Sequence, residues 1–468
     1  MGTAPYGTWR SRLAAAHLVE QAVGLGHVAT ACGDVYWSEA RPSESGREVI
    51  VRRGREGAHH DVVPAGFSAR STVHEYGGRC YTVVRASLWF ANADDQRLYR
   101  CPAEPGAAAT AVTPPPATPR GVRFADLSST PDERWVLAVR ETHGGGEPAN
   151  DLVALPVDAG EGRVHTVAGG HDFVAAPRVS PDGSQLAWLS WDHPNMPWDG
   201  TELWVAPFGP DARVGAARLV AGGRAESISQ PRWSPDGRLH FLSDRNGWWN
   251  LYVDDGRGGR PLAPRAAELC GPDWALGESS YVFLPDGRLV ATWSSGGFAH
   301  LGVLEGDELV EVPTPYCAFS SLAALDGGVA AVAGSPTEEP AVVRIDVASG
   351  SAEVLRRSRP PILDPGDVSA PVAIEFPSEG GRTAHALFYR PAHRDTTGPD
   401  GERPPLVVTC HGGPTGAASP VLDLGVQFWT NRGLAVAAVD YGGSAGYGRP
   451  YRELLRGAWG IVDVDDCV

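Results

Sequence analysis

One four-residue turn recurs at nearly constant spacing along the chain. Its copies are Thr130–Glu133, Ser180–Gly183, Ser234–Gly237 and Leu284–Gly287. Each copy contains Pro-Asp, and the prolines fall at positions 131, 181, 235 and 285, which are 50, 54 and 50 residues apart. Proline fixes φ in such a turn, aspartate bonds to the backbone that follows, and a final glycine allows a positive φ. The pattern therefore predicts one antiparallel hairpin in every repeat, at a spacing close to that of propeller blades.

Strand-like runs accompany these turns. Apolar or alternating segments follow each turn at Trp135–Val139, Gln185–Leu189, Leu239–Leu242 and Leu289–Trp293. A further strand follows at Glu202–Ala206 and at Asn250–Val253, so each repeat holds the several short strands that a four-stranded blade needs. Fainter copies extend the pattern at both ends. We predict a β-propeller of seven blades over residues 31–360, after an N-terminal extension over residues 1–30. The alternative is a different β-rich fold that merely uses a common turn.

The pattern of the sequence changes after Pro360–Pro371, a stretch rich in Pro, Asp and Gly. Strands are expected at Val372–Phe376, Ala384–Tyr389, Leu406–Cys410 and Leu434–Val439, with helices near Leu422–Arg432 and Tyr451–Val468. Continuous apolar strands that alternate with helices are typical of an α/β sheet covered on both faces. Residues 361–468 are therefore predicted to form a second, α/β domain.

The strongest chemical signal is His411-Gly412-Gly413-Pro414, directly after the apolar strand Leu406–Cys410. In α/β-hydrolases, a turn of this type supplies one N–H of the oxyanion hole, and the residue after the nucleophile supplies the other. Glycine suits this position because the backbone must approach the substrate oxygen closely. We expect His411, Gly412 and Gly413 to form this part of an oxyanion hole in the N-terminal part of an α/β-hydrolase domain. A plain strand-terminating turn is the alternative.

Gly442-Gly443-Ser444-Ala445-Gly446 matches the GxSxG pattern of a nucleophile elbow. A helix should follow such a serine at once, whereas the glycine-rich sequence after Ser444 predicts a loop. Histidine follows serine in the chain order of α/β-hydrolases, and no histidine follows His411. The sequence therefore predicts that Ser444 lacks a base and is not a nucleophile. A histidine within hydrogen-bonding distance of the Ser444 hydroxyl would overturn this prediction.

Several other functions are excluded by what the sequence contains. The chain has no lysine, which a phosphate-binding P-loop requires. His74-Glu75 begins like a zinc-binding HExxH motif, but Gly78 replaces the second histidine, so no metal and no cofactor are implied. The net charge of −16 would repel nucleic acid and anionic membranes. The seven cysteines are odd in number and widely spaced, and neither a signal peptide nor an apolar membrane span is evident. We expect a cytoplasmic protein.

Several long segments resemble the prolyl oligopeptidase family of serine peptidases. They are Val73–Gly78, Trp191–Trp204, the HGGP turn, Val439–Arg449, and Trp459-Gly460 with Asp463, Asp465 and Asp466. The two propeller segments are similar to the bacterial dipeptidyl aminopeptidase and acylaminoacyl peptidase branch. In this family, the segment around Ser444 is a loop that precedes the strand of the nucleophile. The resemblance covers nearly the whole chain.

The resemblance implies cleavage of short peptides through an acyl-enzyme, with a propeller that keeps folded proteins out. It implies that Gly413 donates its backbone N–H to the oxyanion while Gly412 and His411 shape the turn. Some branches have a hydroxyl-donating tyrosine at the position of His411. The family's Ser, Asp and His lie downstream of the helix around Asp463–Asp466, beyond Val468. The hydrolase domain over residues 361–468 is therefore expected to be incomplete, with none of the triad present and no activity on its own.

A non-catalytic β-propeller binding module with a vestigial hydrolase remnant is the second hypothesis. Within the family, both a dipeptidyl aminopeptidase and an acylaminoacyl peptidase remain open, as does the oligomeric state. Glu75 and Glu202 are interpreted as structural contacts rather than as specificity determinants, and the sequence assigns no role to the tryptophan-rich segment Trp191–Trp204.

Overall fold

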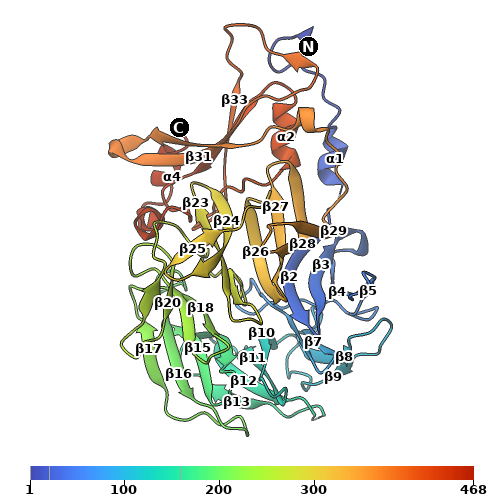
Figure 1. Ribbon diagram of the computed structural model, residues 1–468, viewed down its shortest axis with the longest axis vertical. Helices are drawn as coiled ribbons and strands as arrows, with labels where there is room; N and C mark the ends of the chain where they lie inside the picture. Colours follow the sequence, from blue (N-terminus) through green and yellow to red (C-terminus); the bar gives the residue numbers. More distant parts are fainter. Residues whose placement is uncertain (1, 21, 159) are drawn as a thin grey trace.

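The computed structural model describes residues 2–20, 22–158 and 160–468. Seven four-stranded antiparallel sheets follow one another along the chain, and each is built from consecutive strands. They are arranged as the blades of a ring, with the remaining sheet and most helices gathered at one end of the molecule (Figure 1). This architecture confirms the predicted fold, a seven-bladed β-propeller followed by part of an α/β-hydrolase domain.

The blades have the following strands. Blade 1 contains β2 (Gly24–Ala31), β3 (Asp34–Arg41), β4 (Arg47–Arg53) and β5 (His59–Asp61), and blade 2 contains β6 (Tyr81–Val84), β7 (Ser87–Ala91), β8 (Leu98–Pro102) and β9 (Thr110–Ala111). Blade 3 contains β10 (Val122–Ser129), β11 (Trp135–Thr142), β12 (Ala149–Pro156) and β13 (His165–Ala168), and blade 4 contains β14 (Phe173–Val179), β15 (Gln185–Trp191), β16 (Glu202–Pro207) and β17 (Arg218–Gly222). Blade 5 contains β18 (Ile228–Trp233), β19 (Leu239–Ser243), β20 (Asn250–Val253) and β21 (Arg260–Leu262), and blade 6 contains β22 (Tyr281–Phe283), β23 (Leu289–Ser295), β24 (Phe298–Glu305) and β25 (Glu308–Glu311). Blade 7 contains β26 (Ala318–Leu325), β27 (Gly328–Ser335), β28 (Glu338–Asp346) and β29 (Ala352–Arg357).

The recurring Pro-Asp turns join the first and second strands of blades 3 to 6, as predicted. In blade 4, Asp182 Oδ1 accepts hydrogen bonds from Ser180 Oγ at 2.6 Å and from the Ser184 amide at 3.0 Å. Gly183 takes the positive φ of 76° that ends the turn. Glu133 takes the left-handed conformation at the matching position of blade 3, with φ at 53°. A short local interaction therefore fixes the turn between the first two strands of these blades.

Blades 1 and 7 meet without sharing a strand. Side chains of the two blades pack together instead: the largest core cluster contains residues of both, among them Val28 and Ala330. The Thr30 hydroxyl donates to the Ala324 carbonyl at 2.8 Å across this seam. The first blade begins at Gly24, ahead of the boundary predicted at residue 31. Its opening hairpin turns at Cys32 and Gly33, which both have positive φ, and so lacks the Pro-Asp signal of blades 3 to 6.

The hydrolase region contains a mixed sheet with the strand order β30 (Val372–Pro377), β31 (Thr383–Tyr389), β34 (Ala435–Asp440) and β33 (Leu406–Cys410). Strands β33 and β34 are parallel, and the other two pairs are antiparallel. Helix α2 (Leu424–Thr430) begins at Asp423, whose side chain accepts from the Val426 amide at 2.9 Å. The single-turn helices η2 (Pro365–Asp367) and η3 (Glu379–Gly381) also lie in this region, while η1 (Pro42–Glu44) connects β3 and β4 of blade 1.

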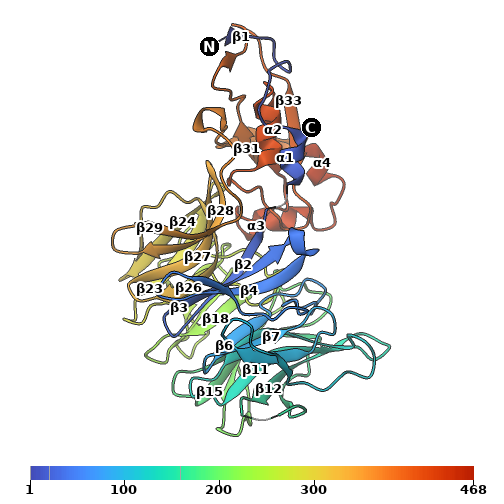
Figure 2. The same ribbon diagram turned by 90° about the vertical axis from the view of Figure 1, so that its right-hand side faces the viewer.

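Residues 2–20 of the N-terminal extension pack mainly on this hydrolase region, and the His17 carbonyl also accepts from Arg359 Nη1 at 3.2 Å, just after blade 7. Strand β1 (Gly2–Thr3) pairs in parallel with β32 (Thr396–Thr397), and the two lie together at the end of the molecule (Figure 2). Helix α1 (Ala15–Val19) lies beside α2. Arg432 Nη2 donates to the Leu13 carbonyl at 2.9 Å. Both ends of the chain therefore contribute to the hydrolase body.

The helix predicted around Tyr451–Val468 is wrong. The structure has three short segments there, α3 (Arg449–Arg452), η4 (Glu453–Leu455) and α4 (Val462–Asp465). Gly457 and Gly460 lie between η4 and α4, with φ at 72° and 74°. Glycine enters this left-handed region at little cost, and two such residues end a helix that apolar spacing alone would continue.

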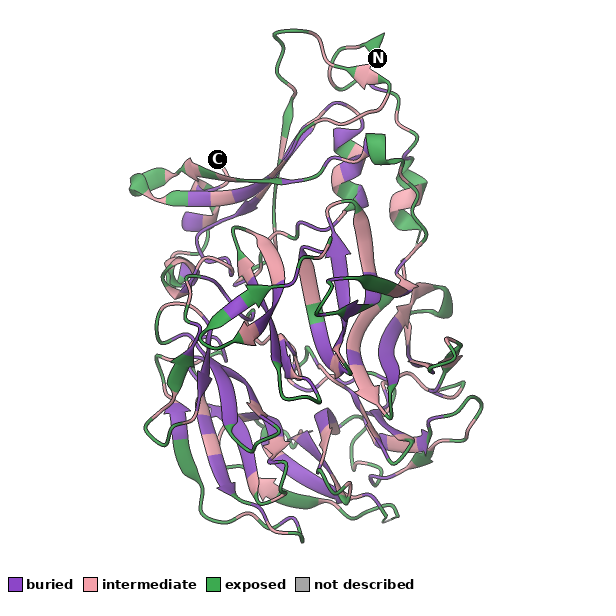
Figure 3. Cartoon of the chain, in the orientation of Figure 1, coloured by how far each residue is buried: buried purple, intermediate pink, exposed green. Residues whose placement is uncertain are grey.

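Burial differs between the two regions. Blade strands are largely buried, whereas β33 is exposed or half-exposed along its whole length (Figure 3). None of the helices that the structure describes has the length and apolar character needed to cross a bilayer.

Candidate active site

The loop that follows β33 is the centre of the candidate site. We call residues His411–Gly416 the oxyanion loop, after the role that the sequence predicts for them. Cys410 at the end of β33 lies opposite Val439 of β34 in a parallel pair. Because the carboxyl ends of parallel strands meet at one edge of a sheet, the oxyanion loop lies beside the segment that follows β34. His411, Gly412 and Gly413 are thus held next to Asp440–Ser444.

His411 contacts Ser444, and the prediction that Ser444 has no histidine beside it is therefore wrong. Nε2 of His411 lies 2.6 Å from the Ser444 Oγ, and Nδ1 lies 2.8 Å from the Gly412 carbonyl. A carbonyl only accepts, so Nδ1 carries the hydrogen and Nε2 accepts from the serine hydroxyl. The prediction failed because it considered only histidines that follow the serine in the chain, whereas parallel pairing of β33 and β34 brings an upstream histidine to it.

The surroundings of Ser444 nevertheless differ from those of a nucleophile elbow. Its side chain is fully buried, at 0% exposure. Its backbone is outside the left-handed region, and the next helix, α3, begins only at Arg449. Asp440 Oδ1 lies 3.9 Å from Nε2 of His411, the same nitrogen that faces Ser444. In a catalytic triad the carboxylate faces Nδ1, which here bonds to Gly412.

Gly413 has the exposure and the free amide that an oxyanion donor needs. It lies on the exposed part of the loop, and its N–H donates to no acceptor within residues 2–20, 22–158 and 160–468. A Cβ at this position would collide with the Tyr441 hydroxyl and approach the Trp459 ring. A Cβ at Gly416 would collide with the His411 ring and the Gly412 carbonyl. The loop therefore requires glycine at both positions.

The His411 ring is further held by stacking. Its centroid lies 4.4 Å from that of Tyr441, at an interplanar angle of 23°. Together with the Ser444 and Gly412 contacts, this leaves the imidazole with few alternative orientations. The arrangement fits the predicted role of His411 in shaping the turn, and it gives Ser444 a structural role as a donor to His411.

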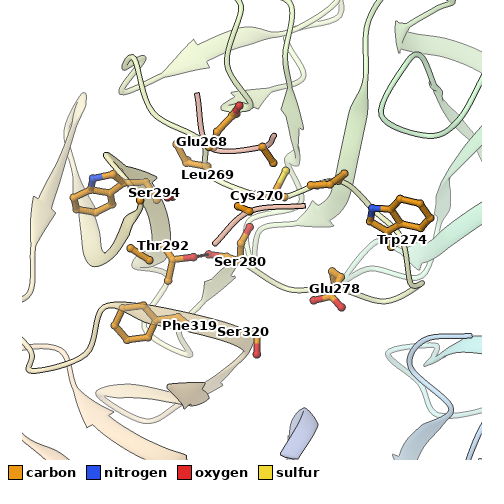
Figure 4. Close-up of a pocket in the computed structure, with 18 of the residues that line it drawn as sticks. Glu268, Leu269, Cys270, Trp274, Glu278, Ser280, Thr292, Ser294, Phe319 and Ser320 are labelled. Carbon is orange, nitrogen blue, oxygen red and sulfur yellow. Dashed lines mark hydrogen bonds between the residues drawn. The ribbon is translucent and has the colours of Figure 1, made fainter. Parts of the chain in front are cut away.

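A cavity of about 370 Å³ lies between the propeller and the hydrolase region (Figure 4). We call it the interdomain cavity. The propeller contributes Glu268, Cys270, Trp274, Glu278, Thr292 and Phe319 among others, and the hydrolase region contributes residues 417–418, 440 and 445–447. Residues Ala417 and Ala418 continue directly from the oxyanion loop, so the cavity opens next to that loop.

Three carboxyl groups, those of Glu268, Glu278 and Asp440, lie among the polar side chains that line the interdomain cavity. Burial raises the pKa of Glu268 to about 7, and burial also raises the pKa of Glu278 and of Asp440 above their ordinary values. Asp440 is held by the Ala418 amide at 2.6 Å and the Tyr447 hydroxyl at 2.7 Å. No arginine stands among the described lining residues of this cavity.

The buried Arg452 and the half-buried Arg449 tie the hydrolase region to the propeller. Asp244 Oδ2 accepts from Arg449 Nη1 at 2.8 Å and from Arg452 Nη2 at 2.6 Å. The Arg452 guanidinium also lies over the Trp249 ring, 3.8 Å from its centroid. Glu268 Oε1 accepts from the Gly448 amide at 3.1 Å. The glycine-rich loop after Ser444 thus serves as an anchor between the two regions.

The remaining residues singled out in the sequence have structural contacts. Glu75 pairs with Arg123 at 2.7 Å, and its side chain is 74% exposed. His74 Nε2 bonds to Asn150 Oδ1 at 3.1 Å. Within the part of the chain that the structure describes, no three His, Cys, Asp or Glu side chains are grouped to share a metal ion. Sequence reasoning missed Asp244, Glu268 and Trp274, because no local motif marks them.

Comparison with known proteins supports the assignment of the fold and of the family. Residues 420–468 match the prolyl oligopeptidase family model. A puromycin-hydrolysing peptidase of Mycobacterium tuberculosis is 40% identical, with a TM-score of 0.92, and the match covers 100% of this chain and 74% of that one. A puromycin hydrolase is 39% identical, with a TM-score of 0.91 and the same coverage.

Dipeptidyl-peptidase 5 of Aspergillus fumigatus is 23% identical over 298 residues, which are 63% of this chain and 34% of that protein. The aligned region is thus about a third of this curated relative. A propeller joined to a hydrolase sheet, with a glycine-rich oxyanion loop at the end of a parallel strand, defines the class of propeller-bearing serine hydrolases. Within that class, the chain belongs to the prolyl oligopeptidase family.

Proposed function

We propose that the chain forms the propeller and the oxyanion-loop side of a serine peptidase that cleaves short peptides through an acyl-enzyme. The observation that carries this proposal is the 40% identity over the whole chain to a peptidase described as puromycin-hydrolysing. The exposed, unpaired amide of Gly413 supports it from the structure.

In the proposed reaction, the carbonyl oxygen of the substrate accepts a hydrogen bond from the Gly413 N–H. This bond strengthens as the oxygen becomes an oxyanion in the tetrahedral intermediate, so it stabilises the transition state more than the bound substrate. Gly412 and His411 hold the loop in the conformation that presents this amide. The interdomain cavity offers room for the substrate beside the loop.

The nucleophile in this proposal is not Ser444. A fully buried hydroxyl cannot reach a peptide carbonyl, and the nearby carboxylate of Asp440 faces Nε2 of His411 rather than the Nδ1 that a triad aspartate holds. The serine, aspartate and histidine of the triad would belong to the part of the hydrolase domain that the relatives have in addition. The 468-residue chain is therefore expected to hydrolyse no peptide on its own.

The test compares the 468-residue chain with a longer form that includes the additional hydrolase residues. Aminoacyl anilides, acyl-aminoacyl anilides and puromycin serve as substrates. We expect turnover by the longer form alone, and preference for free or acylated amines then separates dipeptidyl aminopeptidase from acylaminoacyl peptidase activity. Gly413→Ala in the longer form should lower kcat by about 100-fold or more, because the added Cβ would collide with the Tyr441 hydroxyl and displace the Gly413 N–H from the oxyanion.

Ser444→Ala is the matched variant that decides the role of Ser444. If the 468-residue chain hydrolysed a substrate and Ser444→Ala abolished that activity, Ser444 would be the nucleophile and the proposal would be wrong. If the longer form showed no turnover at all, the non-catalytic binding module would become the better account.

A further inference from the structure

A tryptophan of the propeller contacts the oxyanion loop directly. Trp274 lies in the segment between β21 and β22, which connects blade 5 to blade 6. Its indole Nε1–H donates to the Thr415 Oγ1 at 3.0 Å. Thr415 follows the HGGP turn and is buried, at 3% exposure. This bond joins residues that are distant in the sequence and belong to different regions of the molecule.

Thr415 needs support from its surroundings. Its φ of 60° lies in the left-handed region, which is unfavourable for a β-branched residue and persists only where neighbouring groups hold it. On the hydrolase side, the Ala445 amide donates to the Gly416 carbonyl at 2.9 Å. On the propeller side, the contact is the Trp274 indole. The oxyanion loop is thus held from two directions, and Trp274 supplies one of them.

Trp274 is itself fixed by aromatic packing. Its ring centroid lies 4.5 Å from that of Trp198 and 4.9 Å from that of Tyr76. These three rings line a second cavity of about 280 Å³ in the propeller, and Trp274 also lines the interdomain cavity. The indole therefore forms a wall between the two cavities, with its N–H directed to the loop.

Two sequence segments that lacked a role meet at this tryptophan. Trp198 belongs to Trp191–Trp204, and Tyr76 belongs to Val73–Gly78. The backbone next to Trp274 is bonded to the second segment, since the Leu276 amide donates to the Gly77 carbonyl at 3.0 Å. Both segments thus hold the indole in place.

We propose that Trp274 is a positioning residue for catalysis: its hydrogen bond to Thr415 holds the oxyanion loop, and thereby the Gly413 amide, in the conformation that stabilises the oxyanion. The inference rests on the proposed function of that loop. It also gives the propeller a part in the chemical step, beyond restricting access. The segments Val73–Gly78 and Trp191–Trp204 support this bond indirectly, because they hold Trp274 in place.

Kinetics of the longer, active form test this proposal. Trp274→Phe keeps the aromatic ring and removes the donor, and Thr415→Val keeps the shape and removes the acceptor. Each should lower kcat roughly fivefold, the size expected for one hydrogen bond, with KM changed less than twofold. The double variant should lose no more than either single variant, and Thr415→Ser, which keeps the acceptor, should retain activity close to that of the parent.

Trp135→Phe is the matched control. Its indole Nε1 donates to the Pro210 carbonyl at 3.1 Å within the propeller, so the same bond type is lost away from the loop. This variant should leave kcat unchanged. A kcat for Trp274→Phe equal to that of Trp135→Phe, or fully multiplicative losses in the double variant, would overturn the proposal.

A spectroscopic readout on the 468-residue chain separates this inference from the proposed function. In a ¹H–¹⁵N spectrum, the indole signal of Trp274 is the one that Trp274→Phe removes. Thr415→Val should shift that signal upfield and speed its exchange with solvent, while the Trp135 signal stays in place. An unshifted Trp274 signal would contradict the positioning role, even if the longer form proves to be a peptidase. A shifted signal without any turnover by the longer form would reject only the peptidase assignment.

Discussion

The propeller and the hydrolase region cover their strands differently. Every residue of β20 in blade 5 and of β27 in blade 7 is buried, whereas every residue of β33 is exposed or half-exposed. A blade is covered on both faces by its neighbours in the ring. Strand β33 pairs with β34 on one side, and among the described strands none pairs with its other edge. The comparison teaches that the ring is complete as a packing unit, while the hydrolase sheet depends on its contacts with the propeller.

The largest expected effect comes from the ion pair that joins the two regions. Asp244→Ala would leave the guanidinium groups of Arg449 and Arg452 buried without their shared carboxylate. Removing one partner of a buried pair costs about 3–5 kcal/mol. We expect the free energy of unfolding of the hydrolase region to fall by that amount. Urea denaturation measures it, with limited proteolysis after residue 361 reporting on this region.

Asp307→Ala is the control for this prediction. Asp307 pairs with Arg260 at 3.9 Å on the exposed surface of the propeller. The cost there should stay below about 1 kcal/mol. Equal losses in the two variants would show that the interdomain pair does not stabilise the hydrolase region.

A pair of identical substitutions compares the two kinds of strand. Leu251→Ala in β20 removes a fully buried side chain and should cost about 2–5 kcal/mol through lost burial and a cavity. Leu406→Ala in β33 removes a side chain that is 54% exposed and should cost less than about 1 kcal/mol. Unfolding midpoints in guanidinium chloride measure both. Similar costs would mean that β33 is covered in solution.

The junction between the regions should respond to pH through Glu268. Burial raises its pKa from 4.5 to about 7, so the folded state keeps a proton that the unfolded state releases between these values. Stability therefore falls as the pH rises from about 4.5 to 7, by roughly 1–3 kcal/mol from this group. Glu268→Gln should show a smaller decrease over the same window. A parallel pH profile in parent and variant would remove Glu268 as the cause.

The smallest effect on stability is expected at the edge of β33. Val408→Glu places a charge on an edge strand at a position that is 43% exposed. The free energy of unfolding should change by less than about 0.5 kcal/mol, while light scattering on heating should show less aggregation, because charged edges resist strand pairing between molecules. Unchanged aggregation would indicate that another surface is responsible.

The parts of the fold that follow from local chemistry were predictable. The Pro-Asp turns specify their hairpins within a few residues, and the apolar runs Leu406–Cys410 and Leu434–Val439 correspond to β33 and β34. The start of the ring was less evident, because the turn at Cys32 and Gly33 reaches the same hairpin by positive φ without proline or aspartate. Gly457 and Gly460, which lie between η4 and α4 with positive φ, break the single helix that was predicted near Tyr451–Val468.

The oxyanion loop was predictable from its motif, but its contacts were not. The bond between His411 and Ser444 depends on the parallel pairing of two strands, and the bond between Trp274 and Thr415 joins two regions. Such contacts depend on tertiary structure and leave no periodic or motif signal in the chain. For the same reason, the buried pairing of Asp244 with Arg449 and Arg452 could not be anticipated.

The N-terminal segment, residues 2–20, affects how easily the first and last blades of the ring can separate. Blade 1 and blade 7 share no strand, yet the chain entering blade 1 and the chain leaving blade 7 both continue into the hydrolase body. The N-terminal segment therefore acts as a strap across the seam. Separation of blade 1 from blade 7 would require loss of the pairing of Gly2–Thr3 with Thr396–Thr397 and of the hydrogen bond from Arg432 to the Leu13 carbonyl.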